Sequence, residues 1–226
     1  MKTNPWVKLC KGAILALAVS YGLTYCHTTK SKLTLEQKGD SLTVIHITNP
    51  TNYILLPIEE EAAESQVLLD TGEAADTDMG IRLAQTQVDY FVPFALPVGA
   101  KTATVRIRNK SKEALCWKEI KLSDTFDTTN TEKFRPVYHH TPLYGWMNDA
   151  NGLVYKDGEY HLYFQYNPYG SKWGNMHWGH SVSKDLVHWE HLAPAIARDT
   201  LGHIFSGSSI AVSYTHLRAH ETRHDL

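Results

Sequence analysis

Residues 153–166 have the sequence LVYKDGEYHLYFQY, two runs of apolar and aromatic residues separated by Asp157-Gly158. An Asp-Gly pair between such runs is a strong short-range signal for a β-hairpin. Two further runs, at 176–182 and 187–192, are joined by the short segment 183–186. Four consecutive antiparallel strands with short turns, carrying tryptophans, are typical of a β-propeller blade. The stretch therefore predicts an all-β fold.

A second group of short strands is predicted upstream, within residues 30–122. Residues 33–35 and 42–47 are rich in β-branched residues and flank Lys38-Gly39-Asp40, which indicates a hairpin. Further strands are predicted at 53–57, 66–69, 89–94 and 102–107, and the last is expected to pair with 114–122 through the polar loop 109–112. No helical periodicity persists over a dozen residues, so we expect a small antiparallel β-sandwich. The polar segment 123–133 is interpreted as a linker to a second domain, 134–212.

The composition, 42% hydrophobic and 20% charged, fits a folded globular protein and excludes bulk disorder. A formal net charge of −2 gives no electrostatic attraction to nucleic acid. Three cysteines in 226 residues are too few for a disulfide framework, and Cys116 is interpreted as a small buried hydrophobe. Glu59-Glu60-Glu61 is interpreted as a solvated acidic turn rather than a metal site, because no histidine or cysteine lies nearby.

The first 26 residues have the layout of a secretory signal peptide. Lys2, Lys8 and Lys11 precede the apolar segment 13–19, which is too short to span a bilayer as a helix. Residues 23–26, LTYC, resemble a bacterial lipoprotein box, although Tyr25 replaces the usual small residue. We therefore expect export to the periplasm or cell surface, with membrane attachment if Cys26 is lipidated. A buried N-terminal helix is the alternative.

One carboxylate, Asp149, is the candidate for chemistry. It is flanked by Asn148, follows the aromatic Trp146 and is expected to lie just before the strand that begins at Leu153. Amide donors keep such a carboxylate ionised, and flat rings cover the apolar face of a sugar, so Asp149 is a candidate nucleophile toward a glycosidic bond. From the residues alone, an Asx-type turn in which Asp149 hydrogen-bonds its own backbone is the favoured interpretation.

Residues 146–152, WMNDANG, resemble the signature that opens the catalytic domain of glycoside hydrolase family 32, which contains invertases, inulinases and levanases. Further matches follow in the family's order. They are FQYNP at 164–168, WG at 173–174, HWGH at 177–180, SKDLVHW at 183–189 and FSGS at 205–208. Residues 33–122 also resemble the small β module that precedes the catalytic domain in some secreted bacterial fructan hydrolases.

The resemblance implies a five-bladed β-propeller, of which this chain holds the first blade and the start of the second, and hydrolysis of β-fructosides with retention. It implies that Asp149 is the nucleophile and that Asn148 binds fructose. The other positions that match the fructose subsite are Gln165, Trp173, Phe205 and Ser206. It implies no metal or organic cofactor. The expected ligand is a β-fructan, such as levan or inulin, or a sucrose-type sugar.

Two departures from the family pattern matter. Ala150 stands where the family motif usually has proline, and alanine permits the same backbone conformation. The family's Arg-Asp-Pro motif, with a transition-state-stabilising aspartate, and its Glu-Cys motif, with the acid/base, occur nowhere in the chain. Arg198-Asp199 is followed by Thr200 and precedes Phe205, so it is out of order. We therefore expect the chain to be an inactive N-terminal fragment of a β-fructosidase.

Three alternatives remain at this stage. The chain is a non-catalytic surface protein that binds fructan, or a propeller glycosidase acting on arabinosides or xylosides, or a fructosyltransferase rather than a hydrolase. Residues 213–226 differ in character from the rest, with histidines at 216, 220 and 224. A helix would place these histidines on one face, as in a metal site. We interpret the segment instead as a non-native tail.

Overall fold

The computed structural model describes residues 30–72, 76–129 and 134–211. The predicted signal peptide, the lipidation of Cys26 and the tail 213–226 lie outside these residues. The described residues are almost entirely β-strand and turn, with one four-residue helix, α1 (Cys116–Glu119). The all-β prediction is therefore confirmed. Within this part of the chain, no helix is long and apolar enough to cross a membrane.

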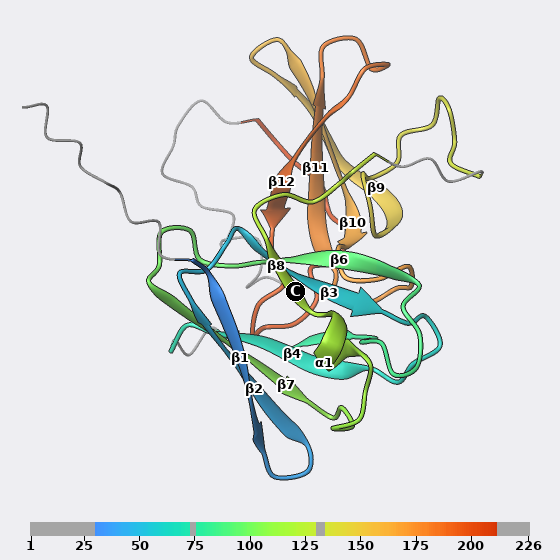
Figure 1. The fold of residues 1–226 in the computed structure, drawn as a ribbon. Helices are drawn as coiled ribbons and strands as arrows, with labels where there is room; N and C mark the ends of the chain where they lie inside the picture. The colour runs from blue at the N-terminus through green and yellow to red at the C-terminus, as the bar shows by residue number, and fades with distance from the viewer. Residues whose placement is uncertain (1–29, 73–75, 130–133, 212–226) are drawn as a thin grey trace, which may run out of the picture.

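The N-terminal half folds as two facing sheets (Figure 1). The first sheet has the strand order β1-β2-β7-β4-β5, and the second has the order β6-β3-β8. Their bounds are β1 (Lys32–Lys38), β2 (Leu42–Thr48), β3 (Tyr53–Ile58), β4 (Ser65–Asp70), β5 (Met79–Ile81), β6 (Tyr90–Ala95), β7 (Thr102–Arg108) and β8 (Lys121–Ser123). All pairings are antiparallel, as the predicted sandwich requires.

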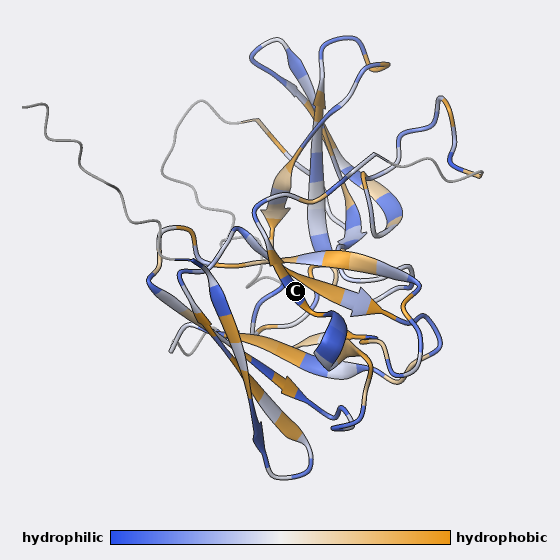
Figure 2. Ribbon diagram, in the orientation of Figure 1, coloured by the Kyte–Doolittle hydropathy of each residue, from blue (hydrophilic) through white to orange (hydrophobic). Residues whose placement is uncertain are grey.

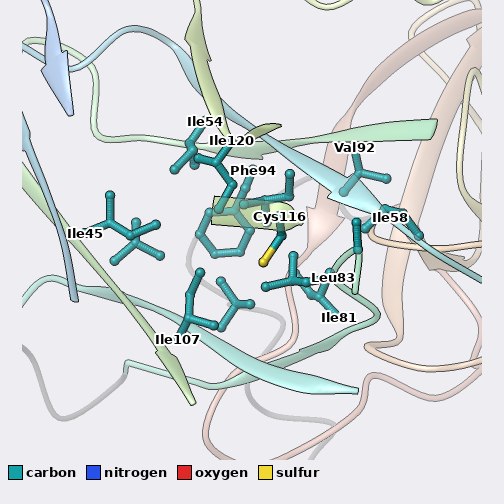
Figure 3. Close-up of a cluster of buried hydrophobic side chains, with 14 of the residues drawn as sticks. Ile45, Ile54, Ile58, Ile81, Leu83, Val92, Phe94, Ile107, Cys116 and Ile120 are labelled. Atoms are coloured by element: carbon teal, nitrogen blue, oxygen red, sulfur yellow. The ribbon is translucent and has the colours of Figure 1, made fainter. Parts of the chain in front are cut away.

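The sandwich core is mainly aliphatic and buried between the two sheets. Along β7, Ala103, Val105 and Ile107 are buried and alternate with half-buried residues, because successive side chains of a strand point to opposite faces. Figure 3 shows the side chains of both sheets converging, with Cys116 of α1 among them. Cys116 is fully buried, as predicted, and burial raises the pKa of its thiol to about 12.

One predicted pairing in this half is wrong. β7 pairs with β2 and β4, whereas 114–122 contributes α1 and then β8, which pairs with β3. The turn of helix forms because Cys116 N–H bonds to the carbonyl of Ala84, and Ile120 N–H bonds back to Cys116. These contacts carry the chain across to the second sheet. The short strand β5 also escaped prediction, since three residues carry little periodic signal.

The third sheet is a four-stranded meander, in the order β12-β11-β10-β9. The strands are β9 (Trp146–Lys156), β10 (Glu159–Asn167), β11 (His177–Ser183) and β12 (Glu190–Ile196). At the first turn Asp157 and Gly158 have φ of 53° and 89°, the pair of positive values that a type I′ hairpin turn needs. The predicted hairpin and the four consecutive antiparallel strands are confirmed.

Two strand boundaries differ from prediction. β9 begins at Trp146 rather than at Leu153, and β12 begins at Glu190 rather than at Val187. The second shift arises because the Asp185 carboxylate accepts backbone N–H bonds from Val187 and His188, at 2.9 and 2.8 Å. These bonds prolong the turn and delay the strand.

The meander packs on the sandwich through the loop 168–175, between β10 and β11 (Figure 1). Tyr169 lies on the sandwich residue Phe94, with ring centroids 5.3 Å apart. Lys172 Nζ donates to the carbonyl of Glu60 at 3.0 Å and pairs with the Glu61 carboxylate at 3.1 Å. The loop that carries Trp173 is therefore anchored to the N-terminal module.

Candidate active site

Asp149 occupies a β-bulge in the first strand of the meander. In the β9–β10 ladder, Gln165 lies opposite Asn148 and Phe164 lies opposite Ala150, so Asp149 has no partner on β10. A bulge of this kind re-aims a side chain and is frequent beside active sites. The prediction that Asp149 precedes the strand is wrong in detail. It lies inside β9, because the ladder continues on both sides of the extra residue.

Two side chains hold the Asp149 carboxylate in its ionised form. Ser206 Oγ donates to Asp149 Oδ2 at 2.7 Å. Together with a second hydrogen bond, from Asn148, this contact lowers the pKa of Asp149 below its ordinary value. A bond from the backbone N–H of Asp149 acts in the same direction and is smaller. The carboxylate is thus held chiefly by the side chains of Ser206 and Asn148 rather than by its own backbone.

The Asn148 amide is oriented by its neighbour. Trp146 Nε1 donates to Asn148 Oδ1 at 3.0 Å. An indole N–H only donates, so the oxygen of the amide must face Trp146. The Asn148 NH₂ group is then available to donate toward Asp149. Trp146, which the sequence motif includes only as a flanking aromatic, therefore sets the direction of an amide that keeps the carboxylate ionised.

Gln165 lies beside Asn148 on the next strand and is buried, with 2% of its surface exposed. Among the described residues, its Nε2 has no hydrogen-bond partner. A buried donor without a partner costs about 1–3 kcal/mol, so such groups in native structures call for an explanation. A ligand hydroxyl next to Asn148 would satisfy it.

Trp173 and Phe205 lie on different segments and are linked by a third ring. Trp173 is 51% exposed and Phe205 68% exposed, and the His203 ring lies between them, with centroids 5.0 and 6.2 Å away. The structure thus brings Asp149 and Ser206 into contact, Asn148 and Gln165 into register, and Trp173 and Phe205 into one row of rings.

Two residues that support this row, His203 and Trp178, escaped prediction as site residues. His203 Nδ1 accepts the backbone N–H of Met176 at 3.0 Å, and Trp178 Nε1 donates to the carbonyl of Phe205 at 2.8 Å. Both bonds fix the segment 203–206 against β11, so that Ser206 reaches Asp149. Trp178 belongs to the HWGH motif, so the sequence could have indicated it as a site residue. Nothing in the sequence distinguishes His203.

The site therefore presents an ionised, exposed carboxylate beside amide and hydroxyl donors and half-exposed aromatic rings. The carboxylate is positioned to attack an electrophilic carbon, the donors to bind hydroxyl groups, and the rings to cover apolar C–H surface. A sugar offers all three features. Among the described residues, no group of three or more histidine, cysteine or acidic side chains is arranged to hold a metal ion.

Comparison with known families divides the chain in two. Residues 39–138 match a domain of unknown function, DUF4980, and residues 139–225 match the glycosyl hydrolases family 32 N-terminal domain. The resemblance to family 32 is therefore confirmed for the second part of the chain. The match includes the bulge and the segment 203–206.

Individual relatives cover the same part of the chain. The levanase of Bacillus subtilis is 63% identical over 79 residues, 35% of this chain and 12% of the levanase. The extracellular exo-inulinase of Aspergillus awamori is 47% identical over 92 residues, 38% of this chain and 17% of the inulinase. The crystal structure of that exo-inulinase aligns with a TM-score of 0.34 and 46% identity, covering 38% of this chain and 17% of the inulinase. The chain thus spans less than a fifth of the length of these relatives.

Proposed function

We propose that this chain is part of a retaining β-fructosidase that hydrolyses the glycosidic bonds of a fructan, levan or inulin, or of sucrose. The observation that supports it best is the Asp149 carboxylate, which sits at a bulge and is held ionised by Ser206 and Asn148. The names of the relatives, levanase and exo-inulinase, support the same substrate class. The proposal concerns the longer protein that contains this chain.

In this mechanism Asp149 attacks the anomeric carbon of the fructosyl unit. The bond to the leaving sugar breaks as a second carboxyl, the acid, protonates the leaving oxygen. A covalent fructosyl-enzyme forms, and water then releases fructose while the second group acts as base. A lowered pKa suits Asp149 to its part, because only the ionised carboxylate is a nucleophile. Neither Glu-Cys nor Arg-Asp-Pro occurs in the chain, so we assign the acid/base to no residue of it.

The remaining residues bind the fructosyl unit. Asn148 and Gln165 donate to its hydroxyls, and the unpartnered Nε2 of Gln165 suits that part. Ser206 holds Asp149 and is placed beside the same sugar. Trp173 and Phe205 contribute ring surface against its C–H groups. These interactions hold the fructosyl unit in a fixed position relative to Asp149. Such positioning lowers the barrier to nucleophilic attack.

The remaining sequence features extend this proposal to the whole protein. We propose that residues 1–26 direct export, that Cys26 attaches the protein to a membrane by a lipid, and that 30–122, 123–133 and 134–212 are an accessory module, a linker and the start of the catalytic domain. We further propose hydrolysis rather than transfer to a sugar acceptor. The segment 213–226 is proposed to be non-native.

The test is made on the longer protein with Asp149→Asn, which keeps the size of the side chain and removes the nucleophile. We expect release of fructose from levan, inulin and sucrose to fall by at least about a thousandfold, or ~4 kcal/mol of barrier. The matched control is Asp157→Asn, at the exposed hairpin turn, which should leave the rate unchanged. Full activity in Asp149→Asn would overturn the proposal. Binding of fructan without turnover by the unaltered protein would favour a non-catalytic fructan-binding protein.

A further inference from the structure

A cleft lies where the meander meets the sandwich, and Trp173 is the one residue of its lining that the proposed chemistry uses. Its volume is about 480 Å³, and its lining comes from both halves, including Glu64 and Arg82 of the sandwich and Trp173 and Arg198 of the meander. Small-molecule sites have volumes of about 300–1,000 Å³. The cleft is therefore large enough for a molecule of the size of a disaccharide.

The walls of the cleft are held in place by bonds across the junction. Asn175 is buried, and its amide makes a two-way contact with Gly80, accepting from the backbone N–H at 2.9 Å and donating to the carbonyl at 2.8 Å. The same NH₂ group also donates to Asn167, whose own amide donates to the carbonyl of Lys172. These bonds fix the loop that forms one wall, so the cleft is a preformed feature rather than a loose contact.

The charges of the cleft favour a neutral ligand. Its lining includes three acidic and three basic side chains: Glu60, Glu64, Asp78, Arg82, Lys172 and Arg198. Arg82 pairs with Glu64 at 2.9 Å, and Lys172 is already engaged by Glu61. Burial and the nearby Arg198 lower the pKa of His203, so this side chain adds no positive charge near neutral pH. Equal numbers of acidic and basic side chains give no preference for a charged ligand such as a phosphate or a sugar acid. Hydrogen-bond donors and acceptors are both present, and hydroxyl groups can bond to either.

Two side chains of the cleft lack the partners that a mere packing interface would give them. The large ring of Trp173 remains 51% exposed at the cleft. Within the described part of the chain, the buried Nε–H of Arg198 has no hydrogen-bond acceptor. A sugar hydroxyl would satisfy that donor, and a sugar ring would cover the indole.

The cleft adjoins the row of rings that leads to the site around Asp149. Trp173 and His203 line the cleft, and Phe205 follows His203 in the same row of rings. Ser206, next in sequence, contacts Asp149. We propose that the cleft is a second carbohydrate subsite, in which the N-terminal module and the meander together bind fructosyl units of a fructan chain beyond the unit held at Asp149. This inference rests on the proposed function and gives the module a part in substrate binding.

Calorimetric titration of the full chain with fructose and with linear β-fructan pentasaccharides, one levan-type and one inulin-type, tests it. We expect at least one pentasaccharide to bind about tenfold more tightly than fructose, or ~1.4 kcal/mol. Glu64→Ala should remove at least about half of that advantage on the same free-energy scale, while affinity for fructose stays unchanged. Gln66→Ala, at a second exposed position of the cleft, guards against misfolding of the first variant. The matched control is Glu36→Ala, because Glu36 is also ion-paired and 51% exposed, like Glu64, and lies outside the cleft.

The outcomes separate the two proposals. If fructose and both pentasaccharides bind equally, or if the two cleft variants keep the pentasaccharide advantage, the subsite is overturned and the proposed function stands. If a pentasaccharide binds through Glu64 while fructose does not bind, the cleft stands as a carbohydrate site by itself, and the fructose site at Asp149 is contradicted. If neither sugar binds, the subsite is overturned.

Discussion

The sandwich and the meander bury very different side chains. The main core cluster lies entirely in the sandwich and consists of aliphatic residues with Phe94 and Cys116. The meander instead encloses aromatic residues and six of the buried polar residues, namely Gln165, Asn167, Asn175, His177, Ser181 and Ser183. Figure 2 shows the contrast, since the sandwich strands carry most of the hydrophobic colouring.

Buried polar atoms without hydrogen-bond partners are also distributed unequally between the sandwich and the rest of the chain. Among the described residues, four buried side-chain atoms have no hydrogen-bond partner: His140 Nδ1, Asn151 Oδ1, Gln165 Nε2 and Arg198 Nε. All four belong to the part of the chain after residue 134. Burial of aliphatic side chains stabilises a fold, whereas unpaired polar groups destabilise it and remain available to a ligand. The sandwich therefore supplies stability, and the meander holds the groups for binding and chemistry.

The largest expected difference between the two halves is in the response to the same truncation. Leu56→Ala, at a fully buried position of β3, should lower the free energy of unfolding by about 2–5 kcal/mol. Leu192→Ala, at a position of β12 that is 41% exposed, should cost about 1 kcal/mol or less. Urea denaturation followed by circular dichroism measures both. Equal losses of unfolding free energy in the two variants would contradict the conclusion that the sandwich supplies most of the stability.

A second comparison uses two glycines of the meander, both with positive φ. At Gly152, φ is +56°, and an added Cβ would lie 2.7 Å from Ser209 Oγ and 2.9 Å from the Tyr163 ring. At Gly158, φ is +89° and nothing lies within 4 Å. Gly152→Ala should therefore cost about 2–3 kcal/mol, and Gly158→Ala about 1–2 kcal/mol, because only the first adds a clash to the backbone strain.

The same urea titration measures the glycine pair. Binding of fructose adds a second measure, because Gly152 lies next to the bulge of Asp149. We expect Gly152→Ala to weaken fructose binding and Gly158→Ala to leave fructose binding unchanged. Equal stability losses in the two variants would mean that the close approach at Gly152 relaxes without cost.

The third comparison is of pH dependence, and the expected effect is smaller. Burial lowers the pKa of His177 from 6.5 to about 4, with 4% of the residue exposed. The unfolded chain therefore binds more protons than the folded chain between these values. The stability from neutral His177 is complete above pH 6.5 and is lost as the pH falls toward 4, by about 2 kcal/mol between pH 7 and pH 5.

Urea denaturation at pH 7 and pH 5, followed by tryptophan fluorescence, measures this loss. Most described tryptophans lie in the meander, so the signal reports that half. His177→Asn should reduce the pH dependence, while His139→Asn, at an exposed position, should not. A pH dependence that survives in His177→Asn would assign the effect to other groups, His140 first, since burial also lowers its pKa to about 4.

The fold was predictable wherever a local signal agreed with the pairing of strands. Asp157-Gly158 fixed the hairpin because few residues accept two consecutive positive φ values. The partner of β7 was not predictable from the sequence. Segment 114–122 is close in sequence and apolar, but its contacts with Ala84 and Gln85 turn it away from β7. Pairing between distant segments is decided by tertiary contacts that no short window contains.

The candidate site was predictable in its residues and not in its geometry. The sequence motif indicated Asp149, Asn148 and Ser206, and the structure brings them together. It did not indicate that Asp149 is an extra residue of the ladder, because a bulge alters pairing without altering composition. It also gave no sign of His203, whose part depends on a ring from another segment, Trp173.

The β9–β10 ladder contains two single-residue slips in pairing. Together they determine which way the side chains face at each end of the hairpin. Pairing shifts once at Asp149 and once between Asn151 and Val154, each time with the extra residue on β9. The side chains of a strand alternate with a period of two, so two slips restore the original parity. Both ends of the hairpin thus keep the facing of an uninterrupted pair, and only the segment between the slips is out of phase. Sequence changes confined to that segment can therefore alter the chemistry without reversing either face of the sheet.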